Sequence, residues 1–478
     1  MKNKRKGISI ILSVLISIIC LFSLTVFSYT LFKLNIIPTK YLVLGYIILI
    51  LIVGILFYLI FIKKNIVIKI ISVILIGLLS GGFNFISIYL NNTNDFFEST
   101  HKSYDTLNYS VIVLKESNHK KISDLKDKNI AYIDDDYKND IKNNFKKISY
   151  NEQLFTDLSV IADDLLNKNT DAIVLEESYL TLAYEEIKDF KDSVKVIDTF
   201  SIKAKVHKEN KDEKINFEEP FVLYISGIDQ YGNVNSVRGR SDVNQLVVVN
   251  PKTHHILLVN TPRDYYVQLY NTTGLRDKLT HAGIYGIDKS IKTLEKFYDI
   301  DINYYLRVNF NSLIRVVDVI GGINIYSDKE FIAHTNKSVK VKEGWNSFNG
   351  TQALAYSRER YAYITGDHHR GANQQQVIEA IINKVTQSSV LISKYNSILN
   401  ALDGTFQTDM STNMITSFIK EQLDNMPKWE VESIAVTGYN SSNYTYSMGM
   451  RYKLYVMEPD YNSVEKAKKK MNEVLNEN

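Results

Sequence analysis

Residues 221–264 read FVLYISGIDQYGNVNSVRGRSDVNQLVVVNPKTHHILLVNTPRD, and this stretch decides the fold of the C-terminal part of the chain. Three runs rich in β-branched and aliphatic residues predict strands at 221–229, 242–250 and 255–264. The connection NPKTH between the second and third runs is short, so these two strands are expected to be antiparallel. The longer connection between the first two runs can also reverse the chain, and consecutive strands usually lie side by side.

Two reversals of direction would bring four polar residues to the same end of the sheet. These residues are Asp229, Asp242, Arg263 and Asp264. The loop before the second strand adds Arg238 and Arg240, and its glycines relax the constraints on a backbone that lies near a ligand. We therefore expect carboxylates and guanidinium groups to share one rim of the sheet.

Two later segments contribute further arginines. In TQALAYSRERYAY, Arg358 and Arg360 stand two residues apart, which puts them on one face of an extended chain but on different faces of a helix. The pair is therefore expected to leave a short helix. GDHHRGANQQQVIEAIINKV contains Arg370, then an amphipathic helix with Gln374 at its N-terminus. Arginine binds phosphate oxygens with a planar fork of donors, and a helix start favours anions, so the pattern suits a phosphate site.

Three long apolar runs fill the first ninety residues. They predict membrane-spanning helices at 8–32, 41–62 and 66–90, since ~20 apolar residues are enough for a helix to cross a bilayer. Basic residues cluster in the first seven positions and at 63–64, so the positive-inside rule places both regions in the cytoplasm. Everything after residue 95 is then expected outside it. A cleavable signal peptide is the rival interpretation of the first run, but that run is long and no matching cleavage site follows it.

The composition excludes several classes of function. A net charge of +3 is too small for a general attraction to nucleic acid, and the predicted cytoplasmic segments are too short for a DNA-binding domain. No nucleic-acid partner is expected. Cys20 is the only cysteine, which rules out an intramolecular disulfide and a thiolate metal cluster.

The segment 96–216 shows alternating signals for strands and helices. Short β-branched runs predict strands at 110–114, 130–134, 171–176 and 194–198. One apolar helix face is predicted from the spacing of Leu154, Leu158, Ile161 and Leu165. The alternation indicates an α/β domain with a largely parallel sheet, and the charged segment 206–219 suits an interdomain linker.

The C-terminal part resembles the LytR-CpsA-Psr family through six strings that occur in family order over residues 220–390. They are SGIDQYGNVNSVRGRSD, NTPRD, DKLTHAGIYG, RVNFNSLIRVVDVIGGINIY, NGTQALAYSRERYAY and GDHHRGANQQQ. The three apolar runs and the extra α/β domain look like the capsule-biosynthesis CpsA branch of the family. The predicted fold is therefore α/β, in three parts: a three-helix transmembrane region (1–95), a small accessory α/β domain (96–216), and a LytR-CpsA-Psr domain with a central mixed sheet (217–478).

The resemblance also implies an apolar tunnel for a polyprenyl tail, with a Mg²⁺-assisted pyrophosphate site at its mouth. It implies that Asp229 and Asp242 organise the Mg²⁺. The arginines implied to bind phosphate are Arg238, Arg263, Arg358, Arg360 and Arg370. Gln374 and Lys278 match polar positions of the same pocket, whereas Asn373 stands where many members have arginine. Asp264 is either the base for the incoming hydroxyl or a partner that orients Arg263.

The function implied is a Mg²⁺-dependent phosphotransferase in the cell membrane, with its soluble domains extracytoplasmic. It would join a polyprenyl-pyrophosphate-linked anionic glycopolymer, capsular or teichoic-acid-like, to peptidoglycan. Such a transfer needs positive charge on both phosphates, because negative charge moves onto the leaving phosphate. The alternative is a non-catalytic regulator of capsule synthesis that binds polyprenyl phosphate, with capsule-machinery proteins as partners. The arginines and carboxylates favour the enzyme.

Overall fold

The computed structural model describes most of the 478-residue chain. The described residues are 2–34, 37–63, 65–100, 104–205, 219–228, 239–364, 366–386, 390, 394, 397–398, 401 and 406–478. They form two compact units. The first unit comprises Met1–Ser99, Thr386–Leu399 and Met410–Pro427, and the second comprises Thr100–Val385, Asn400–Asp409 and Lys428–Asn478.

The described part of the first unit contains the long helices α1 (Lys2–Leu34), α2 (Thr39–Phe61), α3 (Ile66–Thr100) and α14 (Thr412–Asn425). Segments long and apolar enough to cross a membrane lie at Ile11–Lys33, Thr39–Phe61 and Ile66–Ile88, close to the three predicted spans. A small buried cluster between these helices consists of Cys20, Leu56, Ile60, Ile76 and Phe83. Many other apolar side chains of α1–α3 are exposed, as expected of helices whose outer surface faces lipid.

The second unit begins with a five-stranded sheet, which we call the accessory domain (residues 104–205). The strand order is β3-β2-β4-β1-β5. The strands are β1 (Tyr104–Leu114), β2 (Asn129–Ile133), β3 (Asn151–Phe155), β4 (Ala172–Glu176) and β5 (Val194–Lys205). The helices are η1 (Ile122–Leu125), α4 (Lys138–Asn144), α5 (Leu158–Leu166), α6 (Glu177–Glu186) and α7 (Phe190–Ser193). Separate apolar clusters pack the two faces of this sheet.

Two sequence predictions for the accessory domain need correction. The sheet is parallel across β3-β2-β4, but β1 runs antiparallel to both of its neighbours. Leu154 does not share a helix face with Leu158, because it lies in β3, a strand that was not predicted, and is exposed. Asp157 caps the start of α5, so the helix can include only the later residues of the predicted stripe. Most of the predicted linker, residues 206–218, lies outside the described residues.

The rest of the second unit, which we call the main domain, is built on a mixed six-stranded sheet in the order β16-β11-β6-β7-β8-β17. Its strands are β6 (Phe221–Ile228), β7 (Ser241–Asn250), β8 (His255–Asn260), β11 (Tyr304–Asn309), β16 (Phe406–Thr408) and β17 (Glu430–Ala435). As predicted, both connections from β6 through β8 reverse the chain. Parallel pairs β6–β11 and β8–β17 flank this antiparallel centre, which confirms the mixed sheet.

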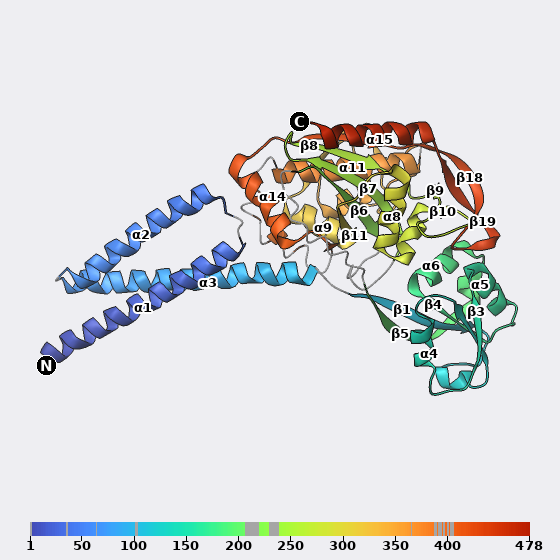
Figure 1. Cartoon of the computed structure of the whole chain (residues 1–478), viewed down its shortest axis with the longest axis horizontal. Helices are drawn as coiled ribbons and strands as arrows, with labels where there is room; N and C mark the ends of the chain where they lie inside the picture. Colours follow the sequence, from blue (N-terminus) through green and yellow to red (C-terminus); the bar gives the residue numbers. More distant parts are fainter. Residues whose placement is uncertain are drawn as a thin grey trace. The chain divides into compact units, whose positions relative to one another are not determined.

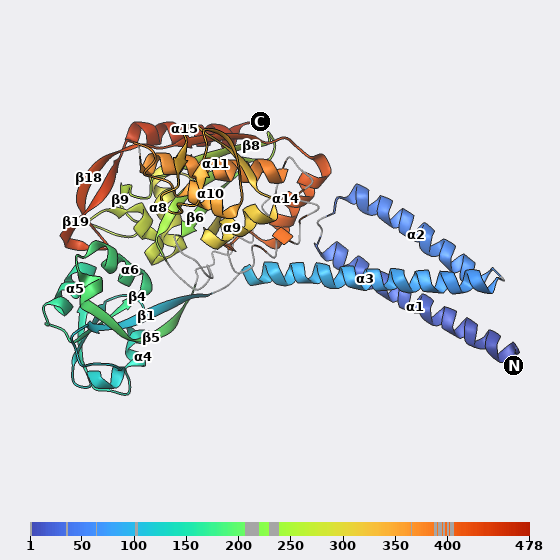
Figure 2. The same ribbon diagram turned by 180° about the vertical axis from the view of Figure 1, so that it is seen from behind.

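Smaller elements surround this sheet. The helical ones are η3 (Leu279–Tyr285), α8 (Ile287–Tyr298), α9 (Phe310–Val319), α10 (Gly350–Ser357), α11 (Asp367–Thr386) and α15 (Tyr461–Asn476). The strands are β9 (Tyr266–Val267), β10 (Asp277–Lys278), β12 (Ile323–Ser327), β13 (Phe331–Ile332), β14 (Lys340–Val341), β15 (Gly344–Phe348), β18 (Gly438–Thr445) and β19 (Gly449–Pro459). Figures 1 and 2 show α15 along an outer side of the main domain and α5 next to the β18–β19 hairpin.

The two faces of the six-stranded sheet are covered differently. One face carries the main core, in which Tyr224 and Tyr305 pack with side chains of α8 and α15. Because side chains alternate along a strand, their neighbours point to the other face. Four aliphatic side chains of β6 and β11 do so, and they are only half-buried: Leu223, Ile225, Leu306 and Val308. Apolar surface at the centre of the sheet is thus left partly uncovered by the described residues.

Candidate active site

The reversals around β7 bring Asp242 and Arg263 together at one end of the sheet. Arg263 Nη1 lies 3.0 Å from Asp242 Oδ1. Thr280 of η3 donates a hydrogen bond of 2.9 Å to the same carboxylate oxygen. The backbone fixes this arrangement, since the Thr280 N–H also donates to the Arg263 carbonyl. The sequence argument from strand direction therefore placed these two residues correctly.

Asp242 is a buried carboxylate surrounded by positive charge. Its burial alone would raise its pKa, because a charged group is disfavoured away from water. The pKa of Asp242 is nevertheless lowered by the guanidinium charges of Arg263, Arg240 and Arg370. The carboxylate is therefore anionic at neutral pH. Its second oxygen, Oδ2, is buried and accepts no hydrogen bond from the residues that the structure describes.

Arg240 belongs to this cluster, although the sequence prediction put Arg238 in the pocket and named Arg240 only as a residue of the loop. Arg238 and Asp229 lie outside the described residues. A tight contact with η3 holds the chain around Arg240. A Cβ on Gly283 would lie 2.4 Å from the Gly239 carbonyl oxygen, so only glycine permits this approach. Arg240 and Asp242 are two residues apart, a spacing that could have indicated a shared face.

Asp264 lies between two cations. One carboxylate oxygen is 3.5 Å from Arg263 Nε and the other is 3.5 Å from Lys278 Nζ. Both Asp264 and Lys278 are buried. Of the two roles that the sequence left open, this arrangement supports an orienting partner, because Asp264 holds both cations at the rim. The role of general base remains a prediction.

The N-terminal part of α11 supplies Arg370. The helix begins at Asp367, seven residues before Gln374, so the prediction that Gln374 stands at the helix start is wrong. Arg370 occupies the first turn instead, and Gln374 follows one turn later on the same side. A Cβ on Gly371 would lie 2.2 Å from Asn260 Nδ2 at the end of β8, so glycine lets the helix approach the sheet there. Backbone carbonyls of β8 and β17 accept hydrogen bonds from Gln375.

The turn after α10 carries Arg358 and Arg360. The prediction that the pair leaves a short helix is confirmed, since α10 ends at Ser357 and Arg358 is its C-cap. The Arg358 guanidinium stacks 4.1 Å from the ring centre of Phe310. Glu359 is buried, and its carboxylate accepts backbone N–H groups, including those of Arg360 and His334. This carboxylate therefore fixes the turn that presents the two arginines.

Asn373, for which the family resemblance implied a departure from arginine, does not contribute a surface group. It is fully buried, and its side-chain amide donates to the Tyr356 carbonyl of α10. Its side chain thus joins α11 to α10, two residues before Arg358. At this position the chain therefore has a packing contact between two helices.

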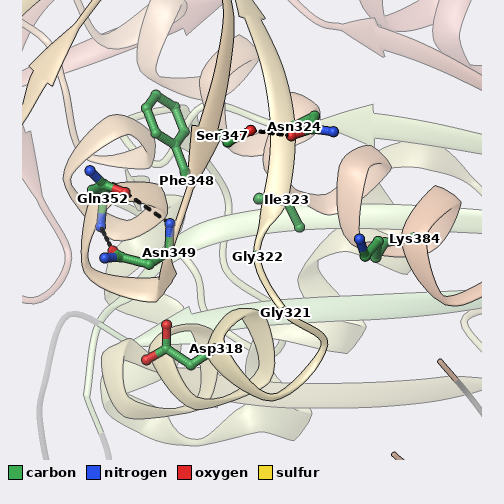
Figure 3. Close-up of a pocket in the computed structure, with 10 residues that line it drawn as sticks. All are labelled: Asp318, Gly321, Gly322, Ile323, Asn324, Ser347, Phe348, Asn349, Gln352 and Lys384. Atoms are coloured by element: carbon green, nitrogen blue, oxygen red, sulfur yellow. Dashed lines mark hydrogen bonds between the residues drawn. The ribbon is translucent and has the colours of Figure 1, made fainter. Parts of the chain in front are cut away.

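A separate hollow of about 340 Å³ contains none of the predicted site residues (Figure 3). It lies at the glycine turn Gly321–Gly322, where α9 meets β12. Several polar side chains that line it already have partners: the Asn349 and Gln352 side-chain oxygens each accept the backbone N–H of the other residue, and the Ser347 hydroxyl donates to Asn324 Oδ1. We therefore place the candidate site at Asp242 and not in this hollow.

Comparison with known proteins gives the same family as the sequence motifs. The LytR_cpsA_psr family profile matches residues 190–473. The polyisoprenyl-teichoic acid–peptidoglycan teichoic acid transferase TagU of Bacillus cereus is 32% identical over 237 residues, covering 49% of this chain and 75% of TagU. The Enterococcus faecalis protein of the same name is 31% identical over 233 residues, covering 48% of this chain and 75% of that protein.

Among solved structures, Bacillus subtilis TagV is 28% identical, with 54% of this chain and 98% of TagV covered and a TM-score of 0.45. The family profile spans more than half of the chain, and the TagU match covers three quarters of TagU. The chain is therefore a member of the LytR_cpsA_psr family.

Proposed function

We propose that this chain transfers a polyprenyl-pyrophosphate-linked anionic glycopolymer onto peptidoglycan, at the cluster around Asp242. The observation that carries the proposal is the convergence of three arginine charges on one buried carboxylate. A structural ion pair needs one partner, whereas Asp242 has three cations near it. Several guanidinium groups gathered at one place suit a ligand with several negative charges, such as a pyrophosphate.

In this transfer, negative charge develops on the phosphates that the arginines around Asp242 would contact. An acceptor sugar hydroxyl attacks the phosphorus next to the glycan, the bond from that phosphorus to the bridging oxygen breaks, and polyprenyl phosphate leaves. The hydroxyl proton goes to a base, for which Asp264 is the candidate in the described residues. Arg263 and Arg370 would stabilise the charge that develops on the leaving phosphate, which is the largest contribution expected in such a site.

Mg²⁺ is the proposed cofactor, held by Asp242 together with Asp229. The buried Asp242 Oδ2, which accepts no hydrogen bond within the described part of the chain, is available as an oxygen ligand. No group of three or more His, Cys, Asp or Glu side chains that could hold a metal occurs among the residues described. That fits Mg²⁺, which commonly uses one or two carboxylates and completes its shell with water and phosphate. When bound, the ion would neutralise part of the pyrophosphate charge.

The polyprenyl tail is proposed to lie on the partly covered face of the sheet. Leu223, Ile225 and Leu306 are half-buried on this face. They lie on the paired strands β6 and β11, and the C-terminal end of β6 leads toward the candidate site. Aliphatic side chains of α11 are also only half-buried, including Ile378 and Ile381. These surfaces supply apolar contacts that a lipid can use. The three apolar helices would anchor the domain at the membrane from which the lipid is delivered, with the soluble domains outside the cell.

The names of the relatives support a wall polymer as the donor. TagU of Bacillus cereus is named as a teichoic acid transferase, so a teichoic-acid-like polymer and capsular polysaccharide are the two donors to compare. The experiment uses the full chain in detergent, with labelled lipid-linked teichoic acid or capsular glycan, peptidoglycan fragments, and either Mg²⁺ or EDTA. We expect transfer with Mg²⁺, and its loss in EDTA and in Arg263→Ala.

Arg315→Ala is the matched control, because it removes the same side chain from an exposed position of α9. Tight binding of the lipid without any transfer by the wild-type chain would replace the enzyme with the non-catalytic regulator. Undiminished transfer in EDTA would remove the metal from the proposal.

A further inference from the structure

The accessory domain is packed firmly against the β18–β19 hairpin of the main domain. Met448 and Leu454 of this hairpin are buried in the same apolar cluster as Leu158 and Ile161 of α5. Asp163 of α5 also accepts a hydrogen bond from the Tyr452 hydroxyl and pairs with Arg451. A continuous apolar core between the two domains fixes the position of the helix that follows, α6.

The last turn of α6 reaches the cations of the candidate site. Glu185 accepts hydrogen bonds from both terminal nitrogens of Arg240, at 2.5 Å and 3.1 Å. Glu186 Oε1 lies 3.7 Å from Lys278 Nζ. The accessory domain therefore places two carboxylates on two cations that also lie near Asp242 and Asp264.

The hairpin links the accessory domain to the same site by a second route. Ser447, next to the buried Met448, donates its backbone N–H to Asp277 Oδ2. Asp277 Oδ1 in turn accepts the backbone N–H of Lys278. The strand that carries Lys278 is thus held by the hairpin on which the accessory domain packs.

The two pairs of carboxylates differ in exposure. The side chains of Asp242 and Asp264 are each 8% exposed, whereas those of Glu185 and Glu186 are 46% and 25% exposed. Ion pairs that include a solvated carboxylate are weak and easily exchanged. The terminal nitrogens of Arg240 that Glu185 occupies are the donors that a phosphate would use in a bidentate contact. Glu185 and a phosphate therefore compete for the same donors.

We propose that Glu185 and Glu186 are positioning residues that act as internal competitors of the phosphate. They hold Arg240 and Lys278 at the rim, and the ligand phosphate displaces them. The accessory domain thereby lowers the affinity of the site for polyprenyl phosphates and promotes release of the polyprenyl phosphate product. This inference rests on the proposed phosphate site, but it concerns a different domain and predicts an effect of opposite sign.

The test measures binding of farnesyl pyrophosphate to the full chain in detergent by isothermal titration calorimetry at constant Mg²⁺ and ionic strength. Glu185→Gln and Glu186→Gln should each bind the probe about two- to five-fold more tightly than wild type, the range expected for partly exposed ion pairs. Release of the probe, followed by stopped flow, should slow by the same factor. A purely structural role for these carboxylates would leave the affinity unchanged or weaken it.

Glu177→Gln is the matched control, because it removes the same charge from the first turn of α6, ~12 Å along the helix axis. Its affinity should equal that of wild type. A further control is the double variant Glu185→Gln with Arg240→Gln. Its gain in affinity should vanish, because the guanidinium for which Glu185 and the phosphate compete is absent.

Arg263→Lys, which keeps the charge but loses the fork of donors, separates the two proposals. Weakened binding in Arg263→Lys together with tighter binding in Glu185→Gln supports both. If Arg263→Lys binds weakly but neither glutamate variant binds more tightly, the competitor role is overturned and the phosphate site remains. Unchanged affinity in Arg263→Lys would remove the phosphate site itself and the competitor role with it.

Discussion

Two buried aspartates of the main domain, Asp242 and Asp277, have opposite surroundings. Asp277 is fully buried, and both of its oxygens accept hydrogen bonds, from Lys278 and Ser447 backbone N–H groups. His281 Nδ1 lies 2.7 Å from Asp277 as well. Asp242 has three arginine charges around it and a buried oxygen that none of the described residues satisfies.

A structural carboxylate and a functional one can be distinguished by their hydrogen bonds and by the charges around them. A carboxylate whose hydrogen bonds are all made within the protein stabilises the fold and has no oxygen left for a ligand. A carboxylate with an unsatisfied oxygen and several guanidinium groups around it still has capacity for a ligand. Asp277 therefore belongs to the framework that positions Lys278, and we propose that Asp242 belongs to the active site.

The largest effect is expected for Asp242→Asn. This change keeps the size of the side chain but removes the charge around which the arginines gather, so transfer should fall about 10²- to 10³-fold. The measurement is the rate of transfer of labelled lipid-linked glycan, with near-ultraviolet circular dichroism as the check on folding. If folded Asp242→Asn transfers glycan at the wild-type rate, the distinction between the two aspartates is wrong.

Asp277→Ala should act on stability. Removing this carboxylate leaves two buried backbone N–H groups without their acceptor, so the free energy of unfolding should fall by about 2–4 kcal/mol. Thermal unfolding of the full chain in detergent measures this change. Asp242→Asn serves as the comparison, and a larger loss of stability in Asp242→Asn than in Asp277→Ala would reverse the assignment.

Leu306→Ala tests whether the lipid and the phosphates of the ligand bind to different parts of the protein. Loss of apolar contact on the partly covered face should weaken binding of farnesyl pyrophosphate by ~1 kcal/mol. Binding of inorganic pyrophosphate should not change, because Leu306 contributes no charge. Equal weakening for both ligands would show that Leu306 acts on the phosphate site or on folding, and not on the lipid.

The smallest effect concerns pH. The pKa of Asp242 is lowered from its ordinary value of 3.8 by the three arginines, so the folded state binds the proton less readily than the unfolded state. The stabilisation from its charge is therefore fully present above pH 3.8 and is lost as the pH falls through the lower folded value. The stability of wild type relative to Asp242→Asn should decline over that acidic range. A difference that stays constant there would contradict the lowered pKa.

Local sequence patterns predicted much of the main domain. The β-branched runs, the short connection from β7 to β8 and a longer connection from β6 to β7 that could also reverse the chain together predicted Asp242 beside Arg263. The start of α11 was harder to predict, because Gly371 breaks the helical pattern and is explained only by its contact with Asn260. A contact of this kind depends on residues distant in the sequence.

Contacts between the accessory domain and the main domain could not be predicted from local sequence patterns. Nothing in the spacing of Glu185 and Glu186 indicates that they meet Arg240 and Lys278, since the pairing depends on how α6 docks. Arg240 is a different case, because its two-residue spacing from Asp242 was visible in the sequence. The family resemblance implied a phosphate-binding role for Arg238 and none for Arg240.

The most direct test of the central claim is a crystal structure of the full chain with a polyprenyl pyrophosphate and Mg²⁺. We expect phosphate oxygens within hydrogen-bonding distance of Arg263 and Arg370, an ion on Asp242, and the lipid along Leu306 and Ile225. Phosphates bound elsewhere, for example in the hollow at Gly321–Gly322, with Asp242 and Arg263 still paired only with each other, would contradict it.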